Sequence, residues 1–325
     1  MHVYILAPHG RAAGGTKVLL NLAQGLSQRG ITVTVIFNKL ESLDWFDEPL
    51  LFKVKLSTWV TYHDLPGCDV LINFCDGTVY GPYGTVPQIL YLQGFGSQDY
   101  AREAVNLQYR YAAVVTTSKW LADIVLNCGH SPYIIPPPID SYFSKQDIAK
   151  QSRVTIGTVY HEAPLKNTSL FFDVLNYIQN NIKELSAVFL TARAPTSRVS
   201  FKALKCPHTV SINPPRRSIP NVYSQTHVWV STSLSEGFGL PILEAMACGI
   251  PTVVVPSCGL DAHLVNKTNC MLAANTKESV GMAIIALLNN EKLREHIITN
   301  GFTLSKKFSM DLFIGSFIEV LNKIK

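Results

Sequence analysis

Two carboxylates separated by seven residues are the most informative chemical feature of this 325-residue chain. Glu236 and Glu244 flank a glycine-containing segment in which a backbone without Cβ atoms can approach a ligand closely. Carboxylates accept hydrogen bonds from vicinal hydroxyl groups, and backbone N–H groups at a helix start bind anionic oxygens. This combination suits a ligand with both a sugar and a phosphate. The alternative is that each Glu only complements the helix dipole, contributing about 0.3–1 kcal/mol.

A strand, a loop, a helix and a second strand are predicted around these carboxylates. The apolar run at residues 228–230 is typical of a buried strand, and Pro241 suits the first turn of a helix. Gly249 ends that helix before the β-branched residues 252–255 begin another strand. Parallel α/β sheets bind ligands at the carboxyl ends of their strands, so we expect Glu244 to lie exposed in the first turns of the helix, beside such an edge.

The same segment resembles a known family signature. The chain reads Glu236-Gly-Phe-Gly-Leu-Pro-Ile-Leu-Glu244-Ala-Met-Ala-Cys-Gly-Ile-Pro251, which is similar to the Glu-x7-Glu motif of retaining GT-B glycosyltransferases, the group 4-type or glycosyl transferases group 1 family. The resemblance implies that Glu244 binds the ribose hydroxyls of a nucleotide. It also implies that Glu236 and the residues after it hold the transferred sugar. The donor-binding residues after Glu236 are Gly237, Phe238, Gly239 and Leu240.

The implied fold is of the α/β class: two Rossmann-like domains that face each other across a cleft, with a C-terminal helix crossing back to the first domain. Length allows this, because single cores rarely grow beyond roughly 250–300 residues. We expect an acceptor-binding domain at residues 1–148, a nucleotide-sugar-binding domain at 149–304 and the crossing helix at 305–325. The polar stretch 141–152 suggests the boundary.

Composition limits where the protein acts. The chain is 47% hydrophobic, yet it has no apolar run of the ~18 residues that a membrane span needs. The first residues lack the basic region of a signal peptide, so we expect a cytoplasmic protein, with peripheral contact at the inner membrane face left open. Seven cysteines without a Cys-x-x-Cys pair favour buried thiols over zinc or redox chemistry. The net charge of +5 arises in the second half of the chain, where residues 151–325 carry 17 Lys and Arg against 11 Asp and Glu. A basic second half suits a diphosphate ligand as well as solubility, and no nucleic-acid partner is expected.

A βαβ unit is predicted at the start of the chain, with strands at residues 2–7 and 31–37 around a helix. Its glycine turn matches neither a Walker loop nor Gly-x-Gly-x-x-Gly. Gly14 and Gly15 instead resemble the Gly-Gly loop that lies under the donor diphosphate in GT-B enzymes and borders the acceptor site. Thr16 is placed on the acceptor or sugar side.

Two loops after further strands, at residues 70–74 and 88–92, complete the predicted acceptor side. They contribute Asp76 and Gln93. Many family members carry a histidine near Gln93, and the variant here resembles a rhamnosyltransferase-like branch. A glutamine amide can hydrogen-bond a sugar but cannot act as an acid or base. The aromatic-rich residues 41–66 are interpreted mainly as core, with acceptor or membrane contact as the alternative.

The second half offers the cations. After a predicted strand at residues 154–159, the family places an Arg and, five residues later, a Lys that neutralises the departing diphosphate. Lys166 matches the Lys and is predicted to be catalytic together with Glu236, whereas His161 stands where Arg is usual and supplies less charge. Asp261 lies where the family has a Glu, as an imperfect substitute.

The sequence therefore predicts an enzyme of the EC 2.4 class that moves a hexosyl or deoxyhexosyl group from a UDP- or dTDP-type donor, with retention, to a glycan or lipid-linked acceptor in polysaccharide biosynthesis. No cofactor is expected, and no metal, because Asp-x-Asp is absent from the chain. A catalytically silent sugar-nucleotide-binding subunit is the main alternative; an epimerase or phosphorylase on the same fold is another. Neither the sugar nor the acceptor follows from the residues.

Overall fold

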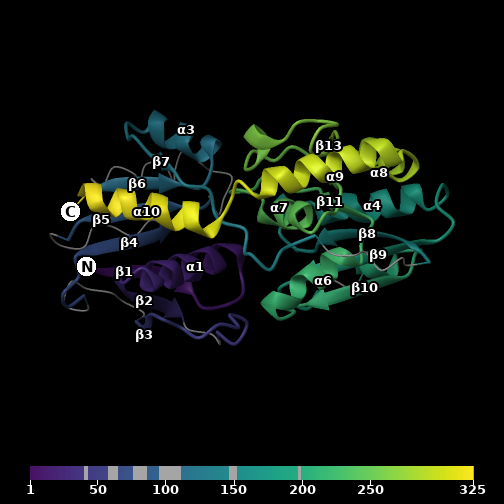
Figure 1. Ribbon diagram of the computed structural model, residues 1–325. Helices are drawn as coiled ribbons and strands as arrows, with labels where there is room; N and C mark the ends of the chain where they lie inside the picture. Colours follow the sequence, from purple (N-terminus) through teal and green to yellow (C-terminus); the bar gives the residue numbers. More distant parts are fainter. Residues whose placement is uncertain are drawn as a thin grey trace. The chain divides into compact units, whose positions relative to one another are not determined.

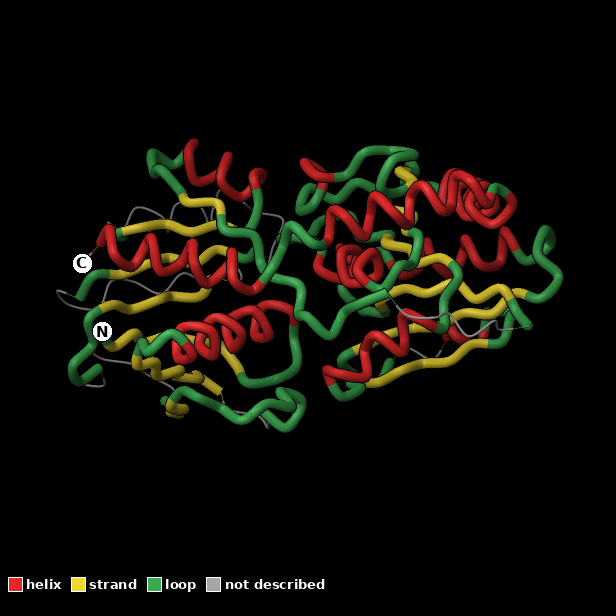
Figure 2. The backbone as a smooth tube through the Cα atoms, in the orientation of Figure 1, coloured by secondary structure: helices red, strands yellow, loops and turns green. Residues whose placement is uncertain are grey.

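The computed structural model describes residues 1–39, 43–57, 65–75, 86–94, 111–145, 152–196 and 199–324. The chain divides into two compact units (Figure 2). One comprises Met1–Pro138 together with Ser309–Lys325, and the other is Ile139–Phe308. Each unit contains one parallel sheet with helices packed on it, so the predicted pair of Rossmann-like α/β domains is confirmed.

The first unit has a seven-stranded sheet in the order β3-β2-β1-β4-β5-β6-β7 (Figure 1). Its strands are β1 (His2–His9), β2 (Thr32–Lys39), β3 (Lys53–Leu56), β4 (Val70–Cys75), β5 (Gln88–Leu92), β6 (Ala113–Thr116) and β7 (Tyr133–Ile134). Its helices include α1 (Gly14–Gln28), α3 (Lys119–Asn127) and α10 (Met310–Ile324). The order reverses between β1 and β4, which creates a topological switch point at their carboxyl ends.

The C-terminal helix α10 returns to this first unit, as predicted. Gly25 of α1 lies so close to Ile314 that a Cβ atom at residue 25 would be 2.4 Å from the Ile314 Cδ1 atom. The ring of Phe317 contacts Tyr91 of β5 edge to face, with 5.0 Å between the ring centroids. The helix is therefore packed into this unit's core and is not a loose tail.

The second unit has a six-stranded sheet in the order β10-β9-β8-β11-β12-β13. Its strands are β8 (Val154–Val159), β9 (Leu185–Thr191), β10 (His208–Ile212), β11 (Val228–Ser231), β12 (Thr252–Val254) and β13 (Met271–Leu272). Its helices are α4 (Thr168–Ile178), α5 (Val199–Lys202), α6 (Ile219–Ser224), α7 (Leu240–Ala247), α8 (Lys277–Asn289) and α9 (Glu291–Ser305), with short 3-10 turns η3 (Pro164–Lys166), η4 (Arg216–Ser218) and η5 (Asp261–His263).

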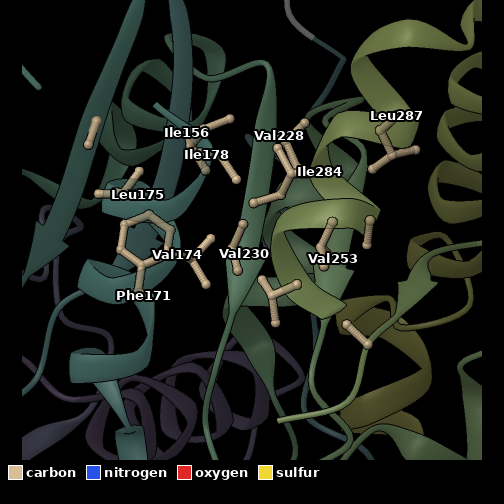
Figure 3. Packing of buried hydrophobic residues seen from close by; sticks show 14 of the residues in the cluster. Ile156, Phe171, Val174, Leu175, Ile178, Val228, Val230, Val253, Ile284 and Leu287 are labelled. Carbon is tan, nitrogen blue, oxygen red and sulfur yellow. The ribbon is translucent and has the colours of Figure 1, made fainter. Parts of the chain in front are cut away.

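Both faces of this sheet are buried, as expected for central parallel strands. On one face, Val228 and Val230 of β11 pack with α4 and α8 (Figure 3). On the other, Trp229 joins a cluster with α7. Gly157 of β8 makes room for that indole, since a Cβ there would lie 2.4 Å from the Trp229 Cε3 atom. The alternation fixes which side chains face which helices.

The second unit begins at Ile139 and ends at Phe308, whereas the sequence analysis placed its bounds at residues 149 and 304. Ile139 and Phe143 are buried in the second unit's core, and so is Phe308 at the return crossing. The Ile139 backbone N–H donates to the Phe308 carbonyl at 2.7 Å, joining the two crossing segments. Because the apolar side chains of Ile139 and Phe143 are buried there, this segment belongs to the second unit, and the first unit ends at Pro138.

Two composition-based expectations are also addressed by the structure. No helix within the described ranges combines the length and the apolar character needed to cross a bilayer. Six cysteines are described as free thiols. Cys206, Cys248 and Cys270 are buried, Cys68 and Cys128 are half-buried, and Cys258 is exposed.

Candidate functional site

The strand order of the second sheet reverses between the parallel strands β8 and β11. The loops that follow these two strands, residues 160–167 and 232–239, therefore meet at their carboxyl ends. The backbone joins them directly. The Leu234 N–H donates to the Leu165 carbonyl at 2.7 Å, and the Thr232 hydroxyl donates to the Asn167 carbonyl at 3.0 Å. Asn167 adopts a left-handed conformation (φ 47°) that ends the short turn η3 and starts α4.

This junction brings together the two residues predicted to be catalytic. The Lys166 Nζ donates to both carboxylate oxygens of Glu236, each at 2.7 Å. The Lys166 side chain is 32% exposed and that of Glu236 is 14% exposed, so the pair is accessible at its ammonium end. An ammonium has three N–H groups, and two donate to Glu236. The third is suited to an anionic oxygen, without requiring the pair to break.

The Glu236 backbone is fixed from the opposite side. Its N–H donates to the Ser257 carbonyl at 2.9 Å. The Asp261 carboxylate in turn accepts hydrogen bonds from the backbone N–H groups of Ser257 (3.1 Å) and Cys258 (2.8 Å). Asp261, identified from the sequence as a substitute for a family Glu, therefore braces the loop that supports Glu236.

Helix α7 begins directly after this loop. Gly239 caps it with φ 101°, a conformation that favours glycine, and Pro241 lies in the first turn. Phe238 is 5% exposed and contacts the ring of Phe308 edge to face, with 5.3 Å between the ring centroids. Phe238, one of the residues predicted to bind the donor, can therefore offer only its backbone to a ligand, because its side chain belongs to the core.

Gly259 supports the same loop, because a Cβ atom there would lie 2.6 Å from the Phe238 carbonyl oxygen. We expect Gly259→Ala to displace the loop and to raise the donor KM by roughly tenfold, since about 1–3 kcal/mol of strain is typical of overpacking. Gly315→Ala in α10 is the control, because its Cβ would meet open space. Initial-rate kinetics on both variants test this, and equal donor KM values would contradict it.

Glu244, in the second turn of α7, is 7% exposed, which corrects the expectation of an exposed first-turn residue. Its Oε2 accepts a hydrogen bond from the Tyr223 hydroxyl at 2.8 Å. Burial and the Glu244 charge raise the pKa of Tyr223 well above its ordinary value, so the phenol stays a donor. A buried carboxylate needs hydrogen-bond donors around it, and the Tyr223 hydroxyl supplies one.

His161 lies in the loop after β8. Its Nδ1 accepts a hydrogen bond from the Ala163 backbone N–H at 2.9 Å, which leaves Nε2 as the proton-bearing nitrogen of a neutral ring. Partial burial, followed by the charges of Lys166 and Arg193, lowers the pKa of His161. The ring is therefore a neutral donor at pH 7, not a substitute for the Arg cation.

Arg193 was missed from the sequence. It follows β9, whose carboxyl end neighbours that of β8, and the signal was a lone basic residue after a predicted strand. The Glu162 carboxylate ties the two loops together by accepting hydrogen bonds from the Thr196 backbone N–H (2.7 Å) and from the Thr196 hydroxyl (2.7 and 2.8 Å). Lys166 and Arg193 are both cations at this edge of the sheet, and the charge of each lowers the pKa of His161.

We expect a histidine titration to place the pKa of His161 below 6.5 and Arg193→Gln to raise it. Because the folded pKa is lowered, the neutral ring contributes stability that is fully present above the unfolded value and is lost as pH falls through the folded pKa. Two-dimensional NMR of the ring protons, with His161→Gln for assignment, measures both pKa values. A His161 pKa at or above 6.5 would contradict the assignment.

In the first unit, Gly15 of the predicted Gly-Gly loop lies close to Gln93 of the predicted acceptor side. Gly15, in the first turn of α1, lies against β4 and the loop after β5, since a Cβ atom there would be 2.8 Å from the Phe74 Cζ and 3.4 Å from the Gln93 Oε1. Within the described residues, the Gln93 Nε2 is buried without a hydrogen-bond partner. Gly14 has open space around it.

Thr16 is placed differently from the prediction. Its side chain is buried, and its hydroxyl contacts the His9 Nδ1 at 3.2 Å, so it serves the packing of α1 on β1. Asp76 lies outside the described residues, as do Trp59 and Tyr62 of the aromatic-rich segment. Phe46 and Phe52 from that segment are buried in the core.

Comparisons with known proteins find similarity in the second unit. Residues 199–303 match the family model described as glycosyl transferases group 1. O-antigen chain mannosyltransferase B of Escherichia coli is 32% identical over 97 residues, 30% of this chain and 25% of that protein. An uncharacterized glycosyltransferase of Methanocaldococcus jannaschii is 39% identical over 83 residues, 25% of this chain and 24% of that protein. The matches thus span about a quarter of each relative.

The solved structures extend the likeness over both units. The crystal structure of HepE from Anabaena in complex with UDP and glucose has a TM-score of 0.81 and 15% sequence identity, and covers 99% of each chain. Two doubly wound units with the site at strand carboxyl ends define the class as a GT-B fold. Residues 199–303 therefore match the glycosyl transferases group 1 family, and the chain as a whole has the GT-B fold, in agreement with the resemblance seen in the sequence.

Proposed function

We propose that the protein is a retaining glycosyltransferase that moves a sugar from a nucleoside-diphosphate donor to an acceptor hydroxyl. The observation that carries the proposal is the Lys166–Glu236 pair at the switch point, beside the start of α7. A cation and helix N–H groups suit a diphosphate, and a carboxylate suits sugar hydroxyls. Glu244 is the proposed ribose ligand.

In the proposed reaction the glycosidic bond between the sugar carbon and the diphosphate oxygen breaks, and the acceptor oxygen bonds to the same carbon on the same face. The leaving diphosphate oxygen takes the acceptor proton, so no protein nucleophile is needed. The protein positions both substrates and stabilises the developing negative charge. Lys166 and the first N–H groups of α7 supply that stabilisation, with Arg193 adding longer-range charge.

The donor class is supported by the neighbours' ligands. HepE was crystallised with UDP and glucose, and the Escherichia coli relative is a mannosyltransferase. We propose a UDP- or dTDP-hexose or deoxyhexose as donor and a glycan or lipid-linked acceptor, in polysaccharide synthesis at the cytoplasmic side of the membrane. Gln93, beside Gly15, is proposed to hydrogen-bond the sugar or acceptor through its amide.

A donor panel tests the function. Purified protein is incubated with UDP-glucose, UDP-galactose, UDP-GlcNAc, GDP-mannose and dTDP-rhamnose, without acceptor, and nucleotide release is measured. We expect slow hydrolysis of one donor, abolished in Lys166→Met/Glu236→Gln. Retention is then read from the anomeric configuration of the transferred sugar by NMR. The proposal would be contradicted if the native protein released nucleotide from every donor no faster than the double variant does.

Turnover is expected to be insensitive to EDTA. The sequence has no Asp-x-Asp, and the proposed charge stabilisation comes from Lys166 and the start of α7. Initial rates with and without chelator, followed by addition of Mg²⁺ or Mn²⁺, measure this. Loss of activity on chelation that either ion restores would show that a metal takes part.

A catalytically silent binding subunit is the second candidate, and two observations favour it. His161 is held as a neutral ring where the family has a cation, and Gln93 cannot transfer a proton. This candidate predicts that the chain binds a nucleoside diphosphate in calorimetry while no donor is turned over, with or without acceptors.

A further inference from the structure

A buried polar network lies behind Glu244 in the second unit. Arg216 of η4 forms an ion pair with Asp140, with 2.7 Å between the guanidinium Nη2 and the carboxylate Oδ1. Both side chains are almost fully buried. The Tyr142 hydroxyl donates to the other Asp140 oxygen at 2.7 Å, and its ring lies 5.8 Å from the Arg216 guanidinium carbon. Asp140 thus receives a donor on each oxygen.

The short helix α6 connects this network to the Glu244 carboxylate. Arg216 is the first residue of η4, which leads directly into α6, and the Tyr223 hydroxyl on α6 donates to Glu244 at 2.8 Å. The Tyr223 ring is itself held, with its centroid 4.3 Å from that of Trp229 and 6.0 Å from that of Phe143. Tyr223 therefore has little freedom to move unless α6 moves with it.

We propose that Tyr223, with α6 anchored by the Arg216–Asp140 pair, is a positioning residue that fixes the Glu244 carboxylate for the nucleotide. The inference rests on the proposed function, in which Glu244 binds the ribose. Tyr223, Arg216 and Asp140 lie outside the Glu236–Glu244 motif from which the site was predicted.

Stability alone does not account for such a network. A buried ion pair is often no more stabilising than apolar side chains of the same volume, because desolvation offsets the attraction between the charges. What the polar groups add is direction: each hydrogen bond fixes an orientation that apolar packing leaves open. A carboxylate that must present its oxygens to two adjacent hydroxyls benefits from that restraint.

The test measures nucleoside-diphosphate binding by calorimetry, with UDP, dTDP and GDP as probes. We expect Tyr223→Phe to weaken binding of the preferred nucleotide about tenfold, the low end for a hydrogen bond to a charged group. In a Glu244→Leu background, which lacks the acceptor of the Tyr223 hydroxyl, we expect Tyr223→Phe to have no further effect on nucleotide binding. Tyr91→Phe is the matched control, because Tyr91 is as deeply buried and, in the described structure, its hydroxyl lacks a hydrogen-bond partner.

The ion pair is tested without leaving a lone buried charge. The double variant Asp140→Asn/Arg216→Gln removes both charges, and we expect it to weaken nucleotide binding in the native background but not in the Glu244→Leu background. Melting curves are recorded for every variant, because a merely structural role would lower melting temperature and weaken binding equally in both backgrounds.

The outcomes distinguish a failure of the positioning role from a failure of the proposed function. Equal nucleotide binding by Tyr223→Phe and Tyr91→Phe, or the same loss in both backgrounds, overturns the positioning role while the proposed function stands. Absence of nucleotide binding by the native protein, or binding that Glu244→Gln leaves unchanged, overturns the proposed function and the positioning role with it.

Discussion

Lys166→Met is expected to lower kcat by about a hundredfold or more while changing donor KM less. Removing one preorganised donor from developing negative charge typically costs 10²–10³ in rate. The structure adds a second effect, because the substitution leaves the Glu236 carboxylate, 14% exposed, without the ammonium that it holds at 2.7 Å. That unpaired negative charge would repel the donor diphosphate.

A double-mutant cycle separates the two effects of Lys166. If repulsion by Glu236 contributes, Lys166→Met/Glu236→Gln loses less activity than the two single losses added in free energy, by about 0.5–3 kcal/mol. Lys119→Met is the control, since this exposed lysine pairs with Asp123 in the first unit and has no part in the proposed site. Native kcat in Lys166→Met would exclude the lysine from the reaction.

Buried strands account for most of what the sequence predicted about the fold. The predicted strand at 154–159 matches β8 residue for residue, and the predicted strand at 88–92 matches β5. Short segments rich in β-branched and apolar residues, with few charges, are typical of strands that are covered on both faces. The short edge strands β3 and β10 were missed because their side chains are largely exposed and their residues are mixed, so no apolar pattern marks them.

The site residues that belong to one local sequence motif were predicted, whereas those that come from distant segments of the chain were missed. Glu236 and Glu244 have seven residues between them and can be recognised together in the sequence, whereas Tyr223, Arg193 and Asp140 reach the site only through tertiary packing. Helical position alone does not show that Glu244 is buried, since burial depends on α6.

Thr16 shows the opposite limit. Sequence reasoning placed it on the acceptor side because it follows Gly15 directly. Successive residues of a helix point about 100° apart, so a neighbour of a site residue commonly faces the core. The Thr16 side chain does so, and its hydroxyl contacts His9.

The two glutamates are expected to fail in different ways. Glu244→Gln should mostly raise the donor KM, because a ribose contact exists in both the ground state and the transition state. Glu236→Gln should mostly lower kcat, because its contact with the sugar matters most as charge develops there. The loss of a charged hydrogen bond is worth roughly 1.5–3 kcal/mol, about ten- to a hundredfold in either parameter.

Stability measurements decide whether these losses belong to the site or to the fold. Glutamine keeps a carbonyl oxygen that can accept from the Tyr223 hydroxyl, so Glu244→Gln should melt within a few degrees of the native protein. Glu244→Leu leaves that buried hydroxyl without its acceptor, and we expect a cost of about 1–3 kcal/mol in unfolding free energy. If Glu244→Gln unfolds the protein, or if both Gln variants keep native kinetics on a native fold, the pair is structural, and the binding role assigned to Glu244 is wrong.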